Sequence, residues 1–428
     1  MMIERQLDRG VDRRALLRTG LALAAGVWSA PAWTRSEDWA AVRALVDRYV
    51  RPRLLPGLAA ALGRGAAAPV FVASGTLARD SAAPVGPDTL YRVYSMTKPV
   101  TGIAAMLLIE DGRLGLDQNI ADFVPGFAAP RVLTEPATSL ASRPANGPIT
   151  VRHLLTHTAG LGYTIVTKGP LLQEYLRLGL TPFAVSRTRL PDVPAVATAP
   201  SLAAFAERLA SLPLIADPGT RWSYSVSLDL LGRVIEVASG MPFERFLEQR
   251  LFGPLGMTSS FFRVPERELP RLATNYLHLP AGPVPIDSGP RSVFADPPAF
   301  PFGGAGLVTS PRDYDRFLWM LAGEGAIGRT RIMAPETARR AMSDLLPDGA
   351  DTRGTQIDGQ GFGAGGRVTR RAVPGGSGAG TFGWGGAAAT VAFVDRARGI
   401  RASGYAQFMP DDRYRWTREL IAAVYEQR

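Results

Sequence analysis

The sequence contains no cysteine among its 428 residues. Disulfide bonds, thiolate catalysis and cysteine-based metal sites are therefore excluded, whereas the compartment in which the protein works stays open. No apolar run reaches the roughly 18 residues that a membrane-spanning helix requires. The remaining composition, with 46% hydrophobic and 20% charged residues, is typical of a packed globular protein.

Lysine is nearly absent as well. Lys98 and Lys168 are the two lysines among 48 basic residues, and all the others are arginine. The formal charge of +10 is spread along the chain, and no arginine cluster is interleaved with aromatic residues. Because a nucleic-acid groove needs such a cluster, we interpret the arginines as a solvated surface and expect no nucleic-acid partner.

Residues 1–32 have the three parts of an export signal and are not expected to belong to the fold. Arg13 and Arg14 precede a short apolar stretch at residues 20–28, and Ala30-Pro31-Ala32 supplies a small-x-small cleavage site. The paired arginines favour the twin-arginine (Tat) route over the general secretory (Sec) route. We therefore expect export to the periplasm or the medium; an ordinary amphipathic helix is the alternative.

Strand patterns occur at both ends of the chain, and helical patterns fill the middle. Strands are predicted at residues 57–65, 69–75, 387–395 and 400–408. Helices are predicted at residues 95–110, 150–157, 201–211, 226–239, 242–250 and 413–427, and from the capping Ser310 onward. Residues 128–148 and 183–200 show no clear period and predict long loops.

This order of elements predicts an α+β fold. One mostly antiparallel sheet would be built from both chain ends and flanked by helices. We expect residues 33–115 and 301–428 to form that part, with residues 116–300 as an inserted, mainly helical domain.

Ser95 and Lys98 begin the expected buried helix at residues 95–110. Residues three apart on a helix share a face, so the hydroxyl and the amine would be neighbours. The free N–H groups and the dipole at the helix start favour a developing alkoxide, and a neutral lysine can accept the serine proton. Arginine could not replace a lysine that must lose its proton. A capping serine beside a solvated lysine is the alternative.

The segment Tyr91-Arg92-Val93-Tyr94-Ser95-Met96-Thr97-Lys98-Pro99 resembles the active-site segment of the serine β-lactamase and penicillin-binding protein superfamily. More narrowly, it is similar to class C β-lactamases and family VIII carboxylesterases. Four further segments match the superfamily in the expected order: residues 149–161, 218–225, 303–307 and 384–386. The resemblance covers nearly the whole chain after the signal and implies a β-lactamase-like α/β/α sandwich.

The resemblance also implies roles for individual residues. Ser95 would be the nucleophile, and Lys98 its proton acceptor or electrostatic support. Tyr224 would act with the lysine as general base and then protonate the leaving group. The backbone N–H groups of Ser95 and Ala387 would form the oxyanion hole, with Ala387 expected on a strand.

Two departures from the β-lactamase pattern favour esters. Val226 stands where β-lactamases of this type carry Asn, and Trp384 stands where they carry Lys. These apolar residues would remove charge-assisted contacts worth about 1.5–3 kcal/mol. We expect Val226, Trp384, Gly385 and Gly386 to line the substrate pocket of a carboxylesterase that cleaves short-chain esters.

Several alternatives stay open. A β-lactamase or D-Ala-D-Ala-type peptidase is the second enzyme class, and a penicillin-binding sensor with little turnover or an inactive scaffold are the others. His153 and His157 stand four residues apart but lack the third ligand of a zinc site, so no metal is expected. No G-x-S-x-G motif accompanies His278, which argues against a Ser-His-Asp triad. We expect Ser377 in a loop near the rim of the active site, no cofactor, and a small-molecule ester or lactam as the partner.

Overall fold

The structure is a computed structural model that describes residues 39–181, 185–187 and 197–426. The predicted export signal and most of the loop predicted at 183–200 lie outside the described residues. Residues 1–39 and residues 40–428 are separate units, and the fold described below is that of the second unit. The predicted boundaries of the inserted domain stay predictions.

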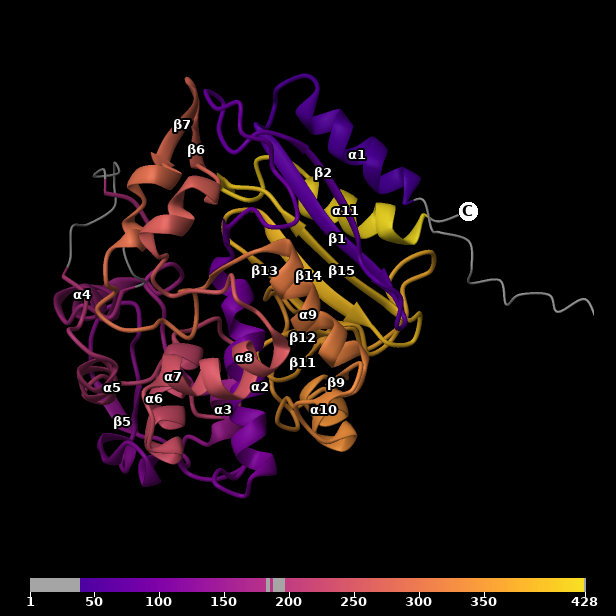
Figure 1. The fold of residues 1–428 in the computed structure, drawn as a ribbon. Coiled ribbons are helices and arrows are strands. Elements are labelled where there is room, and N and C mark those ends of the chain that lie inside the picture. The colour runs from indigo at the N-terminus through magenta and orange to yellow at the C-terminus, as the bar shows by residue number, and fades with distance from the viewer. Residues whose placement is uncertain (1–38, 182–184, 188–196, 427–428) are drawn as a thin grey trace, which may run out of the picture. The chain divides into compact units, whose positions relative to one another are not determined.

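A seven-stranded antiparallel sheet joins both ends of the chain (Figure 1). Its strand order is β11-β12-β13-β14-β15-β1-β2. The strands span Gly361–Phe362 (β11), Arg367–Val368 (β12), Phe382–Gly386 (β13), Thr390–Asp395 (β14), Ile400–Tyr405 (β15), Gly57–Arg64 (β1) and Val70–Gly75 (β2). β1 pairs with β15, so that Ala59 lies opposite Tyr405. The prediction of one antiparallel sheet built from both chain ends is confirmed.

Helices cover both faces of this sheet. Successive residues of a strand point to opposite faces. A side chain at Gly404 of β15 would meet Leu420 of α11 (Trp416–Tyr425), which packs beside α1 (Ala40–Val50). Arg401 faces the other way, toward α9 (Pro311–Ala322), where its guanidinium lies 4.3 Å from the ring centroid of Trp319. The α/β/α sandwich is therefore confirmed.

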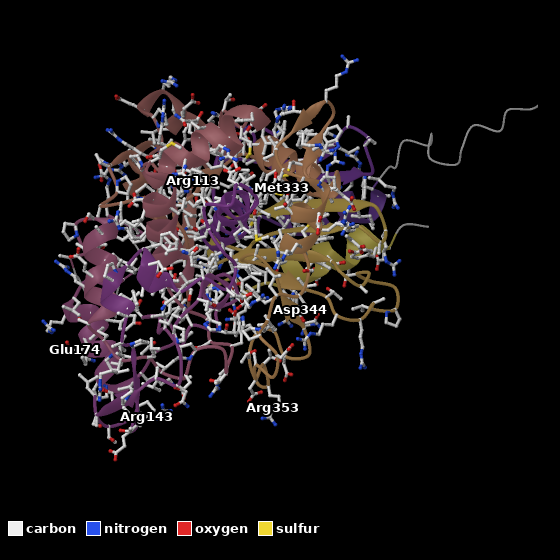
Figure 2. All side chains as sticks on the ribbon, turned by 90° about the horizontal axis from the view of Figure 1, so that it is seen from below. Arg113, Arg143, Glu174, Met333, Asp344 and Arg353 are labelled. Carbon is white, nitrogen blue, oxygen red and sulfur yellow. The ribbon has the colours of Figure 1, made fainter. Side chains whose placement is uncertain are left out.

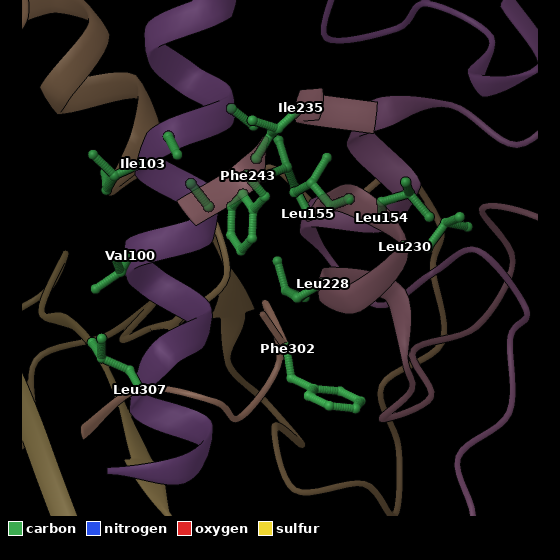
Figure 3. Close-up of a cluster of buried hydrophobic side chains, with 14 of the residues drawn as sticks. Val100, Ile103, Leu154, Leu155, Leu228, Leu230, Ile235, Phe243, Phe302 and Leu307 are labelled. Atoms are coloured by element: carbon green, nitrogen blue, oxygen red, sulfur yellow. The ribbon is translucent and has the colours of Figure 1, made fainter. Parts of the chain in front are cut away.

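Helix α2 (Thr97–Glu110) is the centre of the helical region. It is buried on nearly every side because its sequence, from Val100 onward, is almost entirely apolar. Leucines of α3 and α6, with Phe243, gather beside it (Figure 3). The other helices span Val151–Leu155 (α3), Gly169–Arg177 (α4), Leu202–Ala210 (α5), Ser227–Ser239 (α6), Phe243–Leu247 (α7), Gly253–Leu255 (α8) and Pro335–Ala341 (α10).

Smaller strand pairs occur where long loops or helices were expected. Two of them lie within 116–300: β4 (Arg131–Leu133) with β5 (Ser142–Pro144), and β6 (Asn275–Leu279) with β7 (Gly282–Asp287). The remaining strands are β3 (Tyr91–Arg92), β8 (Val308–Thr309), β9 (Ala326–Ile327), β10 (Thr330–Arg331) and β16 (Phe408–Met409). The two- and three-residue strands among these were missed because such short strands leave no measurable alternation in the sequence. β6 and β7, with five and six residues, are longer and were missed as well.

The predicted strand at 387–395 begins too early. Residues 387–389 form a turn between β13 and β14, and Ala389 has a left-handed backbone with φ +57°. Ala387 therefore lies in this turn and not on a strand. In α11, Trp416, Leu420 and Val424 share the buried face, whereas Ile421 turns toward a cavity.

The arginine-rich surface carries many local ion pairs. Arg143, Glu174 and Arg353 extend outward at the edge of the molecule in Figure 2. Arg143 pairs with Asp217 at 2.6 Å, and Glu174 pairs with Arg177 at the same distance. Within the part of the chain that the structure describes, no helix combines the length and the apolarity that crossing a bilayer requires.

Candidate active site

Ser95 occupies a tight turn directly before α2. The turn, Tyr94–Met96, is a single 3₁₀ turn, and Tyr94 has a left-handed backbone with φ +41°. This conformation is costly for a residue with a side chain. Thr97 holds it through its hydroxyl, which donates to the Tyr94 carbonyl at 2.6 Å and accepts from the Leu307 N–H at 3.1 Å. The nucleophile candidate is thus fixed at the helix start by contacts from two parts of the chain.

The three residues assigned to proton transfer meet at one oxygen. The Tyr224 hydroxyl donates to Ser95 Oγ at 2.6 Å, and Lys98 Nζ donates to the same oxygen at 3.2 Å. The Lys98 amine also lies 4.6 Å from the centroid of the Tyr224 ring. Lys98 is fully buried and Tyr224 is 7% exposed, so bulk water scarcely competes for these contacts.

Lys98 has a second partner that the sequence did not indicate. Its Nζ donates to the carbonyl of Gly304 at 2.7 Å, and the Tyr163 ring centroid lies 5.7 Å away. The N–H of Gly304 in turn donates to Asp229 Oδ1 at 2.8 Å. Burial raises the pKa of Asp229 to about 6, and the charge of Lys98 and the hydrogen bond from Gly304 oppose that rise.

Asp229 was missed because nothing in the local pattern marks it. It lies in the first turn of α6, where an acid is common simply because it complements the helix dipole. The one available signal was its position among Leu228, Leu230 and Leu231, on a face that had to be buried. A charged residue there calls for a partner.

The two histidines that are spaced like metal ligands serve the backbone instead. His153 Nδ1 accepts from the Thr150 N–H at 3.1 Å, and burial lowers the pKa of His153 to about 4. His157 Nδ1 accepts from the Ser225 N–H at 3.2 Å, next to Tyr224. Burial, and then the Lys98 charge, hold the pKa of His157 well below 6.5. Across the described ranges, no group of three or more His, Cys, Asp or Glu could hold a metal ion.

Ser95 opens on a cavity of about 450 Å³. Its walls include Ser95, Tyr224, Ser377, Trp384, Gly385, Gly386 and Ala387. Ser377 thus lies where a rim loop was expected, whereas His278 packs against Phe408 and Tyr414 outside the cavity. Ser95 and the turn that carries Ala387 therefore line the same cavity.

Glycine and tryptophan shape the wall that β13 provides. A Cβ at Gly386 would lie 2.1 Å from the carbonyl oxygen of Val93, so only glycine lets β13 approach the turn before Ser95 so closely. Trp384 Nε1 donates to the Tyr224 hydroxyl at 3.5 Å, and the two rings are 5.8 Å apart.

Val226 differs from the expectation. It is 1% exposed and packs in the hydrophobic core, and it is not among the residues that line the cavity. Because it directly precedes α6, its apolar side chain is drawn into the contact between that helix and its neighbours. Ile165, which is 63% exposed, is an apolar residue that lines the cavity.

Comparisons with known proteins show the family and the fold of this chain. The beta-lactamase family profile matches residues 42–424. Esterase EstB of Burkholderia gladioli is 34% identical over 376 residues, which cover 83% of this chain and 87% of EstB. Protein Rv1367c of Mycobacterium tuberculosis is 35% identical over 323 residues, 73% of this chain and 75% of its own. The solved structure of EstCE1, titled a hydrolase with promiscuous acyltransferase activity, matches with a TM-score of 0.73 and 26% identity, covering 90% of this chain and 98% of EstCE1.

Proposed function

The chain belongs to the beta-lactamase family, and we propose that it is a serine hydrolase that cleaves short-chain carboxylic esters through an acyl-enzyme on Ser95. The observation that carries this proposal is the convergence of Tyr224 and Lys98 on Ser95 Oγ, at 2.6 and 3.2 Å, in the wall of a cavity. A hydroxyl that contacts a phenol and an amine is placed for deprotonation as it attacks.

Acylation begins when Ser95 Oγ attacks the ester carbonyl carbon. The Ser95 proton passes to the base formed by Tyr224 and Lys98 as the new C–O bond forms. The negative charge that develops on the carbonyl oxygen is stabilised by the backbone N–H groups of Ser95 and Ala387. The tetrahedral intermediate then expels the alkoxide, which Tyr224 protonates, and the alcohol leaves an acyl group on Ser95.

Deacylation repeats these steps with water as the nucleophile. Tyr224 and Lys98 take a proton from the water as it attacks the acyl carbonyl carbon, and they return the proton to Ser95 Oγ when the acid leaves. An alcohol in place of water would give acyl transfer. EstCE1, which is titled a hydrolase with promiscuous acyltransferase activity, supports this as a side reaction.

The wall of the cavity supports esters over β-lactams. Trp384 places an indole beside Tyr224 where β-lactamases carry a lysine, so a lactam carboxylate would lose a charge-assisted contact. The relative EstB is named an esterase, which agrees with this preference. β-Lactam hydrolysis, cleavage of D-Ala-D-Ala-type amides and non-turnover penicillin binding are the competing outcomes.

One substrate panel separates these outcomes. We expect the purified protein to hydrolyse p-nitrophenyl butyrate much faster than nitrocefin or a D-alanyl amide. Ser95→Ala should abolish the hydrolysis, and mass spectrometry should detect a butyryl adduct on Ser95 in rapidly quenched wild type. Faster clearance of nitrocefin would overturn the ester preference. Stable labelling by a fluorescent penicillin without ester turnover would support the sensor.

We also propose that the protein is exported, on the strength of the paired arginines, the short apolar stretch and the small-x-small site in residues 1–32. Fractionation of the native host should find the protein outside the cytoplasm, with its N-terminus near residue 33. Replacing Arg13 and Arg14 by lysine should retain it inside if the twin-arginine route is used. Cytoplasmic accumulation of the uncut wild-type chain would contradict the proposal.

A further inference from the structure

Asp229 reaches the catalytic lysine through one glycine. Its Oδ1 accepts the Gly304 N–H at 2.8 Å, and the Gly304 carbonyl accepts Lys98 Nζ at 2.7 Å. All three residues lie in the interior, with Lys98 fully buried and Asp229 4% exposed. The carboxylate and the ammonium therefore face opposite sides of the same backbone residue and make no direct hydrogen bond to each other.

The glycine loop between them is held tightly. The Thr101 hydroxyl donates to the Gly303 carbonyl at 2.7 Å, so α2 grips the loop at two consecutive carbonyls. A Cβ at Gly304 would lie 2.5 Å from Asp229 Oδ2, and one at Gly303 would lie 2.4 Å from the Leu228 carbonyl oxygen. The loop thus leaves no room for side chains at Gly303 and Gly304. Its position depends on its contacts with Asp229 and Leu228 of α6.

Burying a carboxylate to accept the Gly304 N–H carries a desolvation penalty. The amide oxygen of asparagine would accept the same N–H without the cost of burying an ionised group. Burial does raise the pKa of Asp229 to about 6, close to the pH at which an enzyme works. What the acid offers and the amide does not is a negative charge beside a buried ammonium.

We propose that Asp229 is a positioning residue for the acylation of Ser95. In its ionised form it holds Gly304, and through Gly304 it keeps Lys98 against Ser95 while balancing the charge of the lysine. This inference rests on the proposed function, because it assigns Lys98 a part in activating Ser95. Asp229 of α6 is then a second acid–base group, which acts on Lys98, and Lys98 contacts the nucleophile Ser95.

We assign titration near pH 6 to Asp229 and not to the groups that face it. Lys98 faces it from α2, and Tyr163 and Tyr224 are the titratable groups on the neighbouring segments. Burial, with Asp229 and Tyr224 adding to it, raises the pKa of Tyr163 well above 10, so this phenol stays neutral. His157 also stays neutral, since its pKa lies well below 6.5. Activity should be complete well above pH 6, reach half of its maximum near pH 6, and fall further below it as Asp229 takes up a proton.

The test compares Asp229→Asn with Asp313→Asn. Asp313 is a matched control: it is also buried in the first turn of a helix, α9, and also accepts a backbone N–H, from Ser259 at 2.6 Å, but its acceptor contacts are with Ser259 and Ser260 and not with the Gly304 loop. The readouts are the pH profile of p-nitrophenyl butyrate hydrolysis between pH 5 and 8, and the rate at which a fluorophosphonate labels Ser95.

We expect Asp229→Asn to lower kcat and the labelling rate by up to about 100-fold, with KM unchanged. The pH profile of this variant should lack the decrease in activity near pH 6 that the wild type shows. Asp313→Asn should keep both the rate and this decrease. The inference is overturned if Asp229→Asn retains the wild-type rate, or if the decrease near pH 6 survives in it.

A third variant, Ser95→Ala, separates this inference from the function on which it rests. Hydrolysis that survives Ser95→Ala overturns the proposed function together with the inference. Hydrolysis that disappears in Ser95→Ala but is unchanged in Asp229→Asn overturns the inference alone.

Discussion

Arg92 and Lys98 are two buried cations six residues apart, and the structure treats them in opposite ways. Arg92 forms a direct ion pair with Asp287 at 2.5 Å, and its other donors reach the Ala273 carbonyl at 2.5 Å and Gln407 Oε1 at 3.0 Å. Lys98 forms no ion pair among the described residues. Its acid, Asp229, acts through Gly304, which leaves the amine free to contact Ser95.

The difference teaches how to tell a structural cation from a catalytic one. A guanidinium whose donors are all satisfied by fixed acceptors locks the segment that carries it. Here that segment is β3, directly before the strained turn at Tyr94. An ammonium that exchanges protons must keep one direction open toward the reacting atom.

Removing the catalytic cation should have the largest effect. We expect Lys98→Met, and also Lys98→Arg, to lower kcat for p-nitrophenyl butyrate by about 10³-fold or more, because neither side chain can accept a proton. Steady-state kinetics would show this. A Lys98→Arg enzyme within tenfold of wild type would mean that the positive charge alone suffices.

Removing the structural cation should cost stability instead. Arg92→Met leaves Asp287 buried without its partner, which typically destabilises a protein by about 3–5 kcal/mol. Urea unfolding should register the loss, while kcat per folded molecule stays near wild type. Adding Asp287→Leu should restore part of the stability; no recovery in that double variant would argue against the ion pair as the cause.

Replacing the acid behind Lys98 should stabilise the fold at high pH. The pKa of Asp229 is about 6 in the folded protein and 3.8 in a free side chain. The resulting stability is complete below about pH 3.8 and is lost as the pH rises through 6, so the ionised group weakens the native state at pH 8. Asp229→Asn should therefore raise the free energy of unfolding at pH 8, by about 3 kcal/mol at most, and by less at pH 5. A lower Tm at pH 8 would contradict the sign.

Adding a cation to the cavity should have the smallest effect. Trp384→Lys would return a lysine to the position where β-lactamases carry one, beside Tyr224. We expect nitrocefin hydrolysis to rise about tenfold and butyrate ester hydrolysis to fall, since one charge-assisted contact is worth about 1.5 kcal/mol at the low end. Comparing kcat/KM for the two substrates measures the change. An unchanged ratio would show that Trp384 does not set the preference.

The parts of the site that sequence could predict are those with local or periodic signals. Ser95 and Lys98 are joined by helical spacing. Short runs of small and β-branched residues at one chain end, and a hairpin pattern at the other, predicted the sheet in which β1 pairs with β15. Tyr224 was placed by a resemblance covering a whole segment, and the structure brings its hydroxyl to Ser95.

The parts that sequence could not predict depend on contacts between distant segments. Asp229 and Gly304 are 75 residues apart, and no local pattern indicates that one accepts from the other. The burial of Val226 follows from helix packing, and the turn at Ala387 follows from the register of β13 with β14. Each of these is a tertiary outcome that local preference does not fix.

The pairing of β1 with β15 also sets an order for biosynthesis. As the polypeptide emerges from the ribosome, β1 (Gly57–Arg64) cannot pair with β15 (Ile400–Tyr405) until that strand has been synthesised. A nascent chain therefore carries Ser95 long before the turn at Ala387 exists, and such distant pairing makes folding slow. Premature termination upstream of residue 400 would release a product with an uncovered strand edge, which is prone to aggregate.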